Sequence, residues 1–220
     1  MTEQRTTVEH EELSARFETA APGEIISWAV ERFGDELVFA CSFQDLVLLD
    51  LAVAAKPDLE IIFLDTEAHF PETWEYVEEA KRHYGLNLTV TTPGPEAAGT
   101  PCGAEGCCQV RKVAPLKRAV VGKQAWLTAV KRVDAPTRVA TPIVQWDEAF
   151  GLVKVNPLAT WTDEDVAFYE EEHRIPSHPL LAKGYLSIGC APTTKPVEPG
   201  ADPRSGRWAG MDKVECGLHE

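Results

Sequence analysis

Short apolar runs alternate with helix-like segments through the first ninety residues, and this alternation limits the fold more than any other feature of the sequence. The runs at residues 37–40 and 59–64 are rich in β-forming side chains, whereas residues 45–55 and 71–83 look helical, with Pro71 suited to a first turn. Strand, helix, strand and helix in this order are typical of βαβ units. The sequence therefore predicts an α/β fold with an open, mostly parallel sheet flanked by helices.

The chain beyond residue 83 continues the pattern less regularly. Further strands are expected at residues 86–90, 125–130, 142–144 and 152–155. A helix should begin at Thr162, where Asp165 completes a pattern that resembles a capping box. Residues 92–106 are expected to form an irregular loop, and Pro and Gly are frequent from Arg174 onward.

The chain of 220 residues has the size of one α/β domain, and we divide it into three parts. Residues 1–20 are polar and acidic and are interpreted as an N-terminal extension. Residues 21–199 hold the predicted sheet, and residues 200–220 are interpreted as a mobile C-terminal tail.

The formal net charge of −14 disfavours nucleic acid and anionic membranes as partners. Neither a signal peptide pattern nor an apolar run long enough for a membrane helix is found, so a cytoplasmic protein is expected. Residues 111–138 differ from the rest, because they hold eight basic residues and one acid. This segment predicts a pocket for a small anion, and the alternative is a solvated basic helix face.

Polar residues follow the first two predicted strands, where ligands bind in open parallel sheets. Ser42 follows the first strand, and Asp65 and Thr66 follow the second. These side chains either contact a nucleotide or serve as ordinary helix caps. The sequence contains neither the GxGxxG pattern of dinucleotide sites nor the GxxxxGK[ST] pattern of P-loops.

Six cysteines in a chain with no sign of secretion favour metal binding or redox catalysis over a disulfide framework. Cys41 lies in the first predicted strand and is interpreted as a core residue. Cys107 and Cys108 directly precede the basic pair Arg111 and Lys112, and neighbouring cations favour thiolates. Together with Cys190, these thiols suit a soft metal or an iron–sulfur cluster.

Cys216 lies four residues from the end of the chain, and its position suits a different task. A thiol on a mobile tail can attack a substrate that is held elsewhere and then meet a partner thiol. Arg204 and Arg207 lie upstream and suit a phosphate or sulfate group. The alternative is a tail with an unused cysteine and two surface arginines.

Several segments together resemble the APS/PAPS reductase family, the adenylyl-sulfate reductases of assimilatory sulfate reduction and cysteine biosynthesis. The resemblance covers about residues 35–220 and rests on CSFQD, IIFLDTEAHFPET, CCQVRKVAPLKRA, KRVDAPTR, GYLSIGCAPTTKPV, GADPRSGRW and ECGLHE. The paired cysteines before VRK are similar to the cluster-binding branch that uses adenosine 5′-phosphosulfate (APS). The resemblance implies a sheet like that of the adenine nucleotide α-hydrolases.

The resemblance also implies an activity and a role for each matching residue. APS would be reduced to sulfite and AMP, with Cys216 as the nucleophile that becomes S-sulfocysteine and with thioredoxin or a glutaredoxin-like protein as reductant. The resemblance implies that Lys112, Arg204 and Arg207 bind the phosphosulfate and that Ser42, Asp65 and Thr66 bind the nucleotide. Arg138 and His219 are expected as further substrate contacts. Whether the chain forms a homo-oligomer is left open.

Cys107, Cys108 and Cys190 would bind a 4Fe-4S cluster, and the chain departs from the family pattern at the fourth ligand. That ligand is expected three residues after Cys190, where this sequence has Thr193. A hydroxyl is a poor ligand for the iron of such a cluster, so the cluster is either differently ligated, labile, incomplete or absent. Cys102 is a candidate substitute, because the glycines near it allow its loop to bend.

Three other functions remain open from the sequence. A PAPS reductase without a cluster is favoured by Thr193 and disfavoured by the three retained cysteines. An adenylating enzyme of the ATP pyrophosphatase type normally has an SGGxDS-like loop, and CSFQD lacks those glycines. An iron–sulfur or zinc redox sensor would use the other cysteines and would not need the terminal ECGLH.

Overall fold

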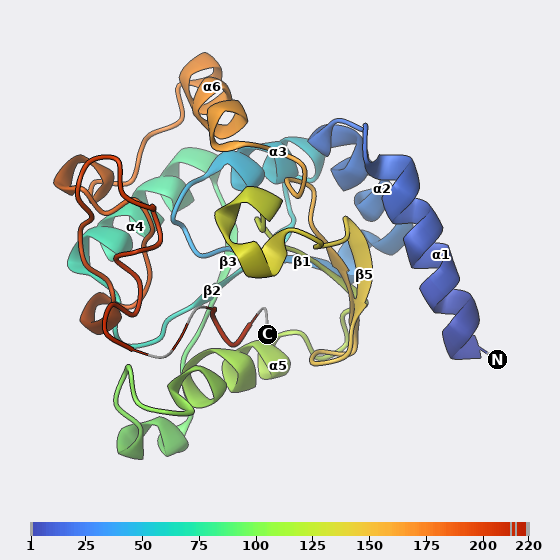
Figure 1. Cartoon of the computed structure of the whole chain (residues 1–220). Helices are drawn as coiled ribbons and strands as arrows, with labels where there is room; N and C mark the ends of the chain where they lie inside the picture. The colour runs from blue at the N-terminus through green and yellow to red at the C-terminus, as the bar shows by residue number, and fades with distance from the viewer. Residues whose placement is uncertain (1, 212, 214, 219–220) are drawn as a thin grey trace. The chain divides into compact units, whose positions relative to one another are not determined.

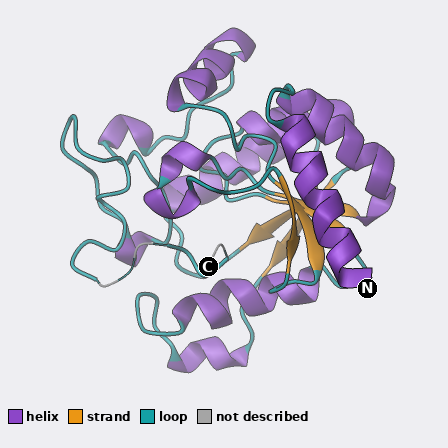
Figure 2. Cartoon of the chain, turned by 45° about the vertical axis from the view of Figure 1, so that its right-hand side comes forward, coloured by secondary structure: helices purple, strands orange, loops and turns teal. Residues whose placement is uncertain are grey.

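The computed structural model of the chain describes residues 2–211, 213 and 215–218. Its strands form a six-stranded sheet in the order β3-β2-β1-β4-β6-β5 (Figures 1 and 2). The helices are α1 Thr2–Phe17, α2 Pro22–Phe33, α3 Val47–Ala55, α4 Pro71–Tyr84, α5 Ala114–Ala119 and α6 Asp163–His173. The strands are β1 Leu37–Ala40, β2 Glu60–Leu64, β3 Asn87–Thr91, β4 Ala125–Leu127, β5 Val144–Asp147 and β6 Leu152–Val155. The predicted fold class is confirmed.

The chain forms two compact units that interleave along the sequence. Unit 1 contains the described residues up to Cys41, Val47–Ile61 and Val120–Ile175. Unit 2 contains Ser42–Leu46, Ile62–Ala119 and the described residues from Pro176 onward. No helix among the described residues is both long and apolar enough to cross a membrane.

In unit 1, β4 pairs with β1 and with β6 in parallel, and β5 runs antiparallel to β6. Every residue of β4 and β6 is buried, as expected for strands that are covered on both faces. The order of the strands reverses between β1 and β4, which is the switch point of a doubly wound sheet.

The N-terminal residues form α1, which lies alongside the edge strand β5 (Figure 1). The Ser14 hydroxyl donates to the carbonyl of Val144 at 2.8 Å and accepts from the amide of Val144 at 2.9 Å. These bonds occupy both backbone groups of one residue of the edge strand. They fix α1 to the sheet in place of a further strand.

Several element boundaries match the sequence prediction and others do not. The strand at 152–155 and the helix that begins after Thr162 are confirmed, and Thr162 forms the expected capping box with Asp165. The strand predicted at 142–144 was placed too early: β5 begins at Val144, since Pro142 has no N–H to give to a ladder. The strand predicted over 125–130 ends at Leu127.

In unit 2, the segment that starts at Pro176 is tied to α4. The Tyr76 hydroxyl donates to the carbonyl of Pro176, and the edge of its ring packs against the imidazole of His178. His178 is buried, and its Nδ1 accepts from the amide of Leu180 at 3.1 Å. Its Nε2 therefore carries the proton and donates to the Thr73 hydroxyl at 3.2 Å.

Burial lowers the pKa of His178 to about 4, against a weaker opposing effect of Glu72. The unfolded chain binds a proton at this position below its ordinary pKa of about 6.5, whereas the folded chain binds one only near pH 4. The unfolded state therefore holds more protons between these values. Stability is lost as the pH falls through this window.

We expect the free energy of unfolding to fall by about 2 kcal/mol between pH 7 and pH 5 because of His178 alone. His178→Gln removes this titration, so the profile of the variant should be flatter by that amount in urea unfolding measured across the range. The exposed His83 provides the control, and His83→Gln should keep the wild-type slope. Parallel profiles for wild type and His178→Gln would contradict the assignment.

Candidate active site

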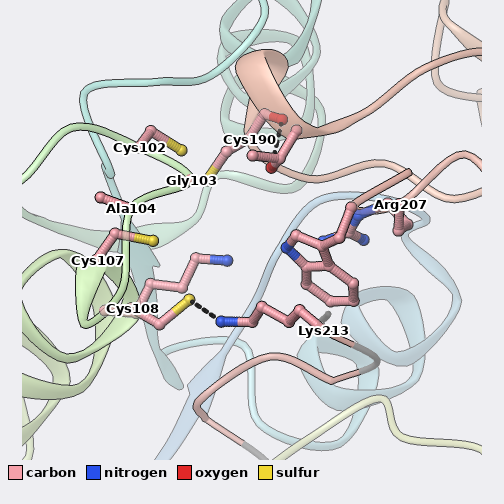
Figure 3. A pocket seen from close by; sticks show the side chains of 11 residues that line it. Cys102, Gly103, Ala104, Cys107, Cys108, Cys190, Arg207 and Lys213 are labelled. Atoms are coloured by element: carbon pink, nitrogen blue, oxygen red, sulfur yellow. Dashed lines mark hydrogen bonds between the residues drawn. The ribbon is translucent and has the colours of Figure 1, made fainter. Parts of the chain in front are cut away.

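Four thiols surround one cavity in unit 2 (Figure 3). The lining residues come from three chain segments: Cys102, Gly103, Ala104, Cys107, Cys108 and Lys112; Cys190 and Thr193; and Arg207, Trp208 and Lys213. In Figure 3 the thiols of Cys102, Cys107 and Cys190 turn toward the same space, and the thiol of Cys108 points toward the amine of Lys213. The cavity therefore combines soft ligands with cations.

Two consecutive turns bring Cys102 and Cys107 to this cavity. The amide of Ala104 donates to the carbonyl of Pro101, and the amide of Cys107 donates to the carbonyl of Ala104, both at 3.1 Å. The third residues of these turns are Gly103 and Gly106, with φ of 97° and 73°. Only glycine adopts this backbone conformation without strain, so the spacing of the two glycines sets the path of the loop.

Arg111 anchors this loop and is not available to a ligand. Its guanidinium donates to the carbonyl of Thr66 at 2.8 Å and to the carbonyl of Ala97 at 2.9 Å, and it pairs with Glu67 at 3.1 Å. The same side chain donates to the carbonyl of Thr100. These bonds fix the residues that precede the cysteines to the end of β2.

The next residue, Lys112, follows the pair Cys107 and Cys108 through the π-helical turn Gln109–Val113 and lies at the cavity. Burial lowers the pKa of Lys112, but the sulfur atoms of Cys216, Cys190 and Cys108 outweigh it, and the net pKa is raised. Lys112 is therefore a permanent cation at the centre of the cysteine group.

Cys190 lies opposite the loop, and its neighbours hold its backbone. The hydroxyls of Thr193 and Thr194 donate to the carbonyl of Cys190 at 3.3 and 2.9 Å. The Thr66 hydroxyl lies 3.5 Å from the sulfur of Cys190. A hydrogen bond from Cys102 lowers the pKa of Cys190 and, together with burial, raises the pKa of Cys102.

The C-terminal segment carries Cys216 to the same group of side chains. The buried carboxylate of Glu215 accepts from Arg204 at 3.3 Å and from the amide of Cys216 at 2.8 Å. Lys112 Nζ then donates to Cys216 Sγ at 3.5 Å, and Lys213 Nζ donates to Cys108 Sγ at 3.2 Å. Glu215 thus positions the backbone of Cys216 beside two cations.

Cys108 and Cys216 share one proton in this arrangement. A hydrogen bond from Cys216 lowers the pKa of Cys108 to about 6, with burial opposing and Lys112 assisting. The same hydrogen bond and burial raise the pKa of Cys216 to about 12, whereas Lys112 lowers it. Cys216 is therefore the proton donor of the pair, and its pKa falls, so that its thiolate forms more readily, when Cys108 no longer accepts this hydrogen bond.

Only part of the Arg207 guanidinium has hydrogen-bond partners among the described residues. Its Nη1 donates to the Ser187 hydroxyl at 3.3 Å and to the carbonyl of Ile188 at 3.1 Å, while its buried Nε has no hydrogen-bond partner among the described residues. A Cβ atom added to Gly189 would lie 2.2 Å from Nη2, so only glycine leaves room for the guanidinium at this position. Burial lowers the pKa of Arg207, and Arg204 adds to this effect.

Three cationic side chains lie around the ring of Trp208. The charged groups of Arg207, Lys213 and Arg204 lie 4.5, 5.6 and 5.7 Å from its centroid. Trp208 itself is buried and has a φ of 52°, a conformation rare for a bulky residue. The aromatic face offsets part of the repulsion between these cations.

The structure brings together most of the predicted site residues. Lys112, Arg207 and all four candidate ligand thiols line the cavity. Cys216 accepts a hydrogen bond from Lys112, and the guanidinium of Arg204 lies 5.7 Å from the ring centroid of Trp208. Ser42, Asp65 and Thr66 are not among the described residues that line it. Asp65 accepts from the amide of Glu67, Thr66 contacts Cys190, and Ser42 is exposed.

The roles expected for two further residues stay predictions. Arg138 lies in unit 1, where its guanidinium pairs with Asp134 at 2.8 Å. His219 lies outside the described residues.

The anion pocket expected in residues 111–138 stays a prediction, because this segment divides between the two units after Ala119. Lys112 is the only member of that basic set among the described cavity residues. Six of the others have partners within their own units: Arg111 and Arg118 donate to carbonyls, Lys123 pairs with Glu60, Lys131 and Arg138 pair with Asp134, and Arg132 pairs with Glu18. The density of basic residues along the sequence did not distinguish the cation at the cavity from cations that bind carboxylates or carbonyls elsewhere.

Sequence reasoning missed Gly189, Trp208, Lys213 and Glu215. The segment RSGRW contained a signal for Trp208, since a tryptophan beside two arginines suits a cation–π contact. Nothing in the sequence distinguished Glu215 from the other acidic residues of the chain.

The donor set of the cavity suits an iron–sulfur cluster in its chemistry. A four-iron cluster takes one thiolate for each iron, so its ligands stand around a larger group than one ion. Four thiols lining one cavity match that requirement in number and in chemistry.

Comparison with known proteins points to one enzyme family. The family described as the phosphoadenosine phosphosulfate reductase domain matches residues 36–196. The adenosine 5′-phosphosulfate reductase of Mycolicibacterium smegmatis is 44% identical over 100% of this chain and 99% of its own length. The protein of the same name from Streptomyces coelicolor is 41% identical over 99% of this chain and 98% of its own.

Solved structures agree with the fold. The phosphoadenylyl-sulfate (PAPS) reductase of Candida auris, solved as a phosphate complex, has a TM-score of 0.71 at 28% identity and covers 84% of this chain and 96% of its own. Yeast FAD synthetase in complex with FAD has a TM-score of 0.60 at 19% identity, over 87% and 67% of the two chains. This second likeness shows the fold alone.

Gly189→Ala should weaken anion binding, because the added methyl group displaces the Arg207 guanidinium. We expect the rise in melting temperature that inorganic sulfate causes in the wild type to fall by at least half in the variant, as measured by thermal unfolding. Gly99→Ala is the matched control, since a Cβ at Gly99 meets nothing within 4 Å. It also reports the general stabilising effect of sulfate. Equal rises in the two variants would contradict the role of Arg207.

Proposed function

The chain belongs to the phosphoadenosine phosphosulfate reductase family, an oxidoreductase family of sulfate assimilation, and we propose that it reduces adenosine 5′-phosphosulfate to sulfite and AMP. The observation that carries the proposal is the docking of Cys216 beside Lys112, with Glu215 holding its backbone. The names of the relatives support APS over PAPS as the substrate.

In the proposed first step, the Cys216 thiolate attacks the sulfur of the substrate's sulfate group. A bond forms between Cys216 Sγ and that sulfur, and the bond from the sulfur to the bridging oxygen breaks. AMP leaves with the electron pair of that bond, and Cys216 becomes S-sulfocysteine.

In the proposed second step, a thiolate of reduced thioredoxin or a glutaredoxin-like protein attacks Cys216 Sγ. Sulfite leaves, and a mixed disulfide remains between Cys216 and the reductant. The second thiol of the reductant then forms its own disulfide and frees Cys216. The dithiol thus supplies the two electrons that the sulfate sulfur takes up.

The cations of the site lower the barrier by neutralising charge. APS is an anion, and a thiolate approaching it adds a further negative charge. Lys112 lies at the nucleophile, and Arg207 has an N–H without a partner among the described residues. Together with Arg204 and Lys213 around Trp208, these groups would hold the phosphosulfate and stabilise the departing AMP.

A 4Fe-4S cluster held by Cys107, Cys108 and Cys190 is part of the proposal. The three thiols line one cavity beside Lys112, which supports the assignment. When bound, the cluster would supply electrostatic tuning next to the substrate and would not itself pass electrons. Binding at Cys108 would also remove this sulfur as the proton-sharing partner of Cys216.

The runner-up function is PAPS reduction without a cluster, favoured by Thr193 and by the likeness to the Candida auris enzyme. Turnover with APS and PAPS in parallel, with reduced thioredoxin and sulfite as the measured product, separates the two. We expect turnover with APS and much weaker turnover with PAPS.

Cys216→Ser should lower sulfite formation by at least about 10³-fold, because a hydroxyl is not ionised where the thiolate would act. Cys41→Ala is the matched control: Cys41 is buried in unit 1, and the variant should keep normal turnover. Normal turnover by Cys216→Ser, or a preference for PAPS by the wild type, would overturn the corresponding part of the proposal.

A further inference from the structure

Thr193 lies at the cavity but has no group to offer a metal. Its hydroxyl donates to the carbonyl of Cys190, and its methyl carbon Cγ2 faces Gly103, 3.1 Å from where a Cβ on that glycine would stand. The side chain is buried between these neighbours. The fourth position of the proposed cluster therefore cannot be filled from residue 193.

Cys102 adjoins the same place from the opposite segment. It precedes Gly103 directly, and Gly103 is the residue that faces the methyl group of Thr193. Its side chain lines the cavity with those of the other three cysteines. Figure 3 shows the Cys102 thiol directed into the cavity.

The two turns explain how Cys102 reaches this position. Gly103 and Gly106 allow the chain to reverse twice within six residues, so that Cys102 and Cys107 approach the cavity from one loop. A Cβ on Gly103 would also lie 3.0 Å from the side chain of Met211. The loop therefore lies against the segments that carry Thr193 and Met211.

We propose that Cys102 is the fourth protein ligand of the iron–sulfur cluster, replacing a cysteine at position 193. The ligand set is then Cys102, Cys107, Cys108 and Cys190, one thiolate for each iron. The fourth ligand then comes from the loop that carries Gly103 and not from the segment that carries Thr193. These two segments face each other at Gly103 and Thr193. This inference rests on the cluster of the proposed function and goes beyond it in assigning a residue.

The test measures iron and acid-labile sulfide per chain after anaerobic reconstitution with ferrous iron and sulfide, followed by the rate at which the visible absorbance bleaches in air. Cys102→Ala should lose at least about a quarter of the iron, since one of four irons lacks its thiolate, and should bleach at least about 10-fold faster than wild type. Cys41→Ala, which also removes one buried cysteine, should match the wild type in both measurements.

A second variant separates loss of a ligand from loss of the fold. Thr193→Cys added to Cys102→Ala should restore iron content and slow bleaching, because it returns a thiol to the other side of the same contact. Far-UV circular dichroism of the metal-free proteins reports whether each variant folds. Failure of the restoring change in a folded double variant would contradict the proposed geometry.

Alkylation with iodoacetamide followed by mass spectrometry gives an independent result on the wild type. Cys102 should be protected in the reconstituted protein and become reactive after the iron is removed by a chelator, together with Cys107, Cys108 and Cys190. Equal labelling of Cys102 in both states, with the other three protected, would overturn the assignment. So would iron, sulfide and bleaching in Cys102→Ala that equal the wild-type values.

Turnover of APS measured on the same preparations keeps the two proposals apart. Wild type that binds no iron or labile sulfide, or that binds one zinc ion instead, yet forms sulfite from APS overturns the Cys102 inference and leaves the Cys216 mechanism standing. Wild type that binds the cluster through Cys102 but forms no sulfite supports the inference and overturns the proposed reaction.

Discussion

The contact between the Lys112 amine and the Cys216 thiol joins the two chain segments on which the site depends. An ammonium group among buried side chains is stable only beside negative partners, and the surrounding sulfur atoms supply them. The segment before Lys112 is anchored through Arg111 to the end of β2, and Glu215 holds the segment that carries Cys216. Removing either anchor would separate the nucleophile from its cation.

Sequence patterns predicted the elements whose signals are local. Strand β6 is the short, mostly apolar run Leu152–Val155, and α6 begins at a capping box, so both could be placed from neighbouring residues alone. Helix α2 was not singled out, although Ile25, Ala29 and Phe33 recur on one buried face. The start of β5 depends on its antiparallel partner, which no pattern within residues 142–147 identifies.

The site was predictable where the residue type itself limits the chemistry. Cysteines beside a basic pair indicated thiolates and a soft ligand, and the structure gathers four of them at one cavity. Charged and hydroxyl side chains were harder to assign, because their partners come from distant segments. Thr66 was expected at a nucleotide, and its hydroxyl also lies 3.5 Å from the sulfur of Cys190. Arg111 donates to backbone carbonyls. Trp208 acts through its backbone conformation and three cations, which composition cannot show.

The central claim is that Cys216 attacks the sulfate sulfur of APS, and trapping the product of that step tests it most directly. Wild-type protein is incubated with APS in the absence of any reductant, digested without reducing agents and mapped by mass spectrometry. The account predicts one added sulfonate group, located on Cys216, and release of an equal amount of AMP. A sulfonate on any other cysteine, or release of AMP without a sulfonated protein, would contradict it.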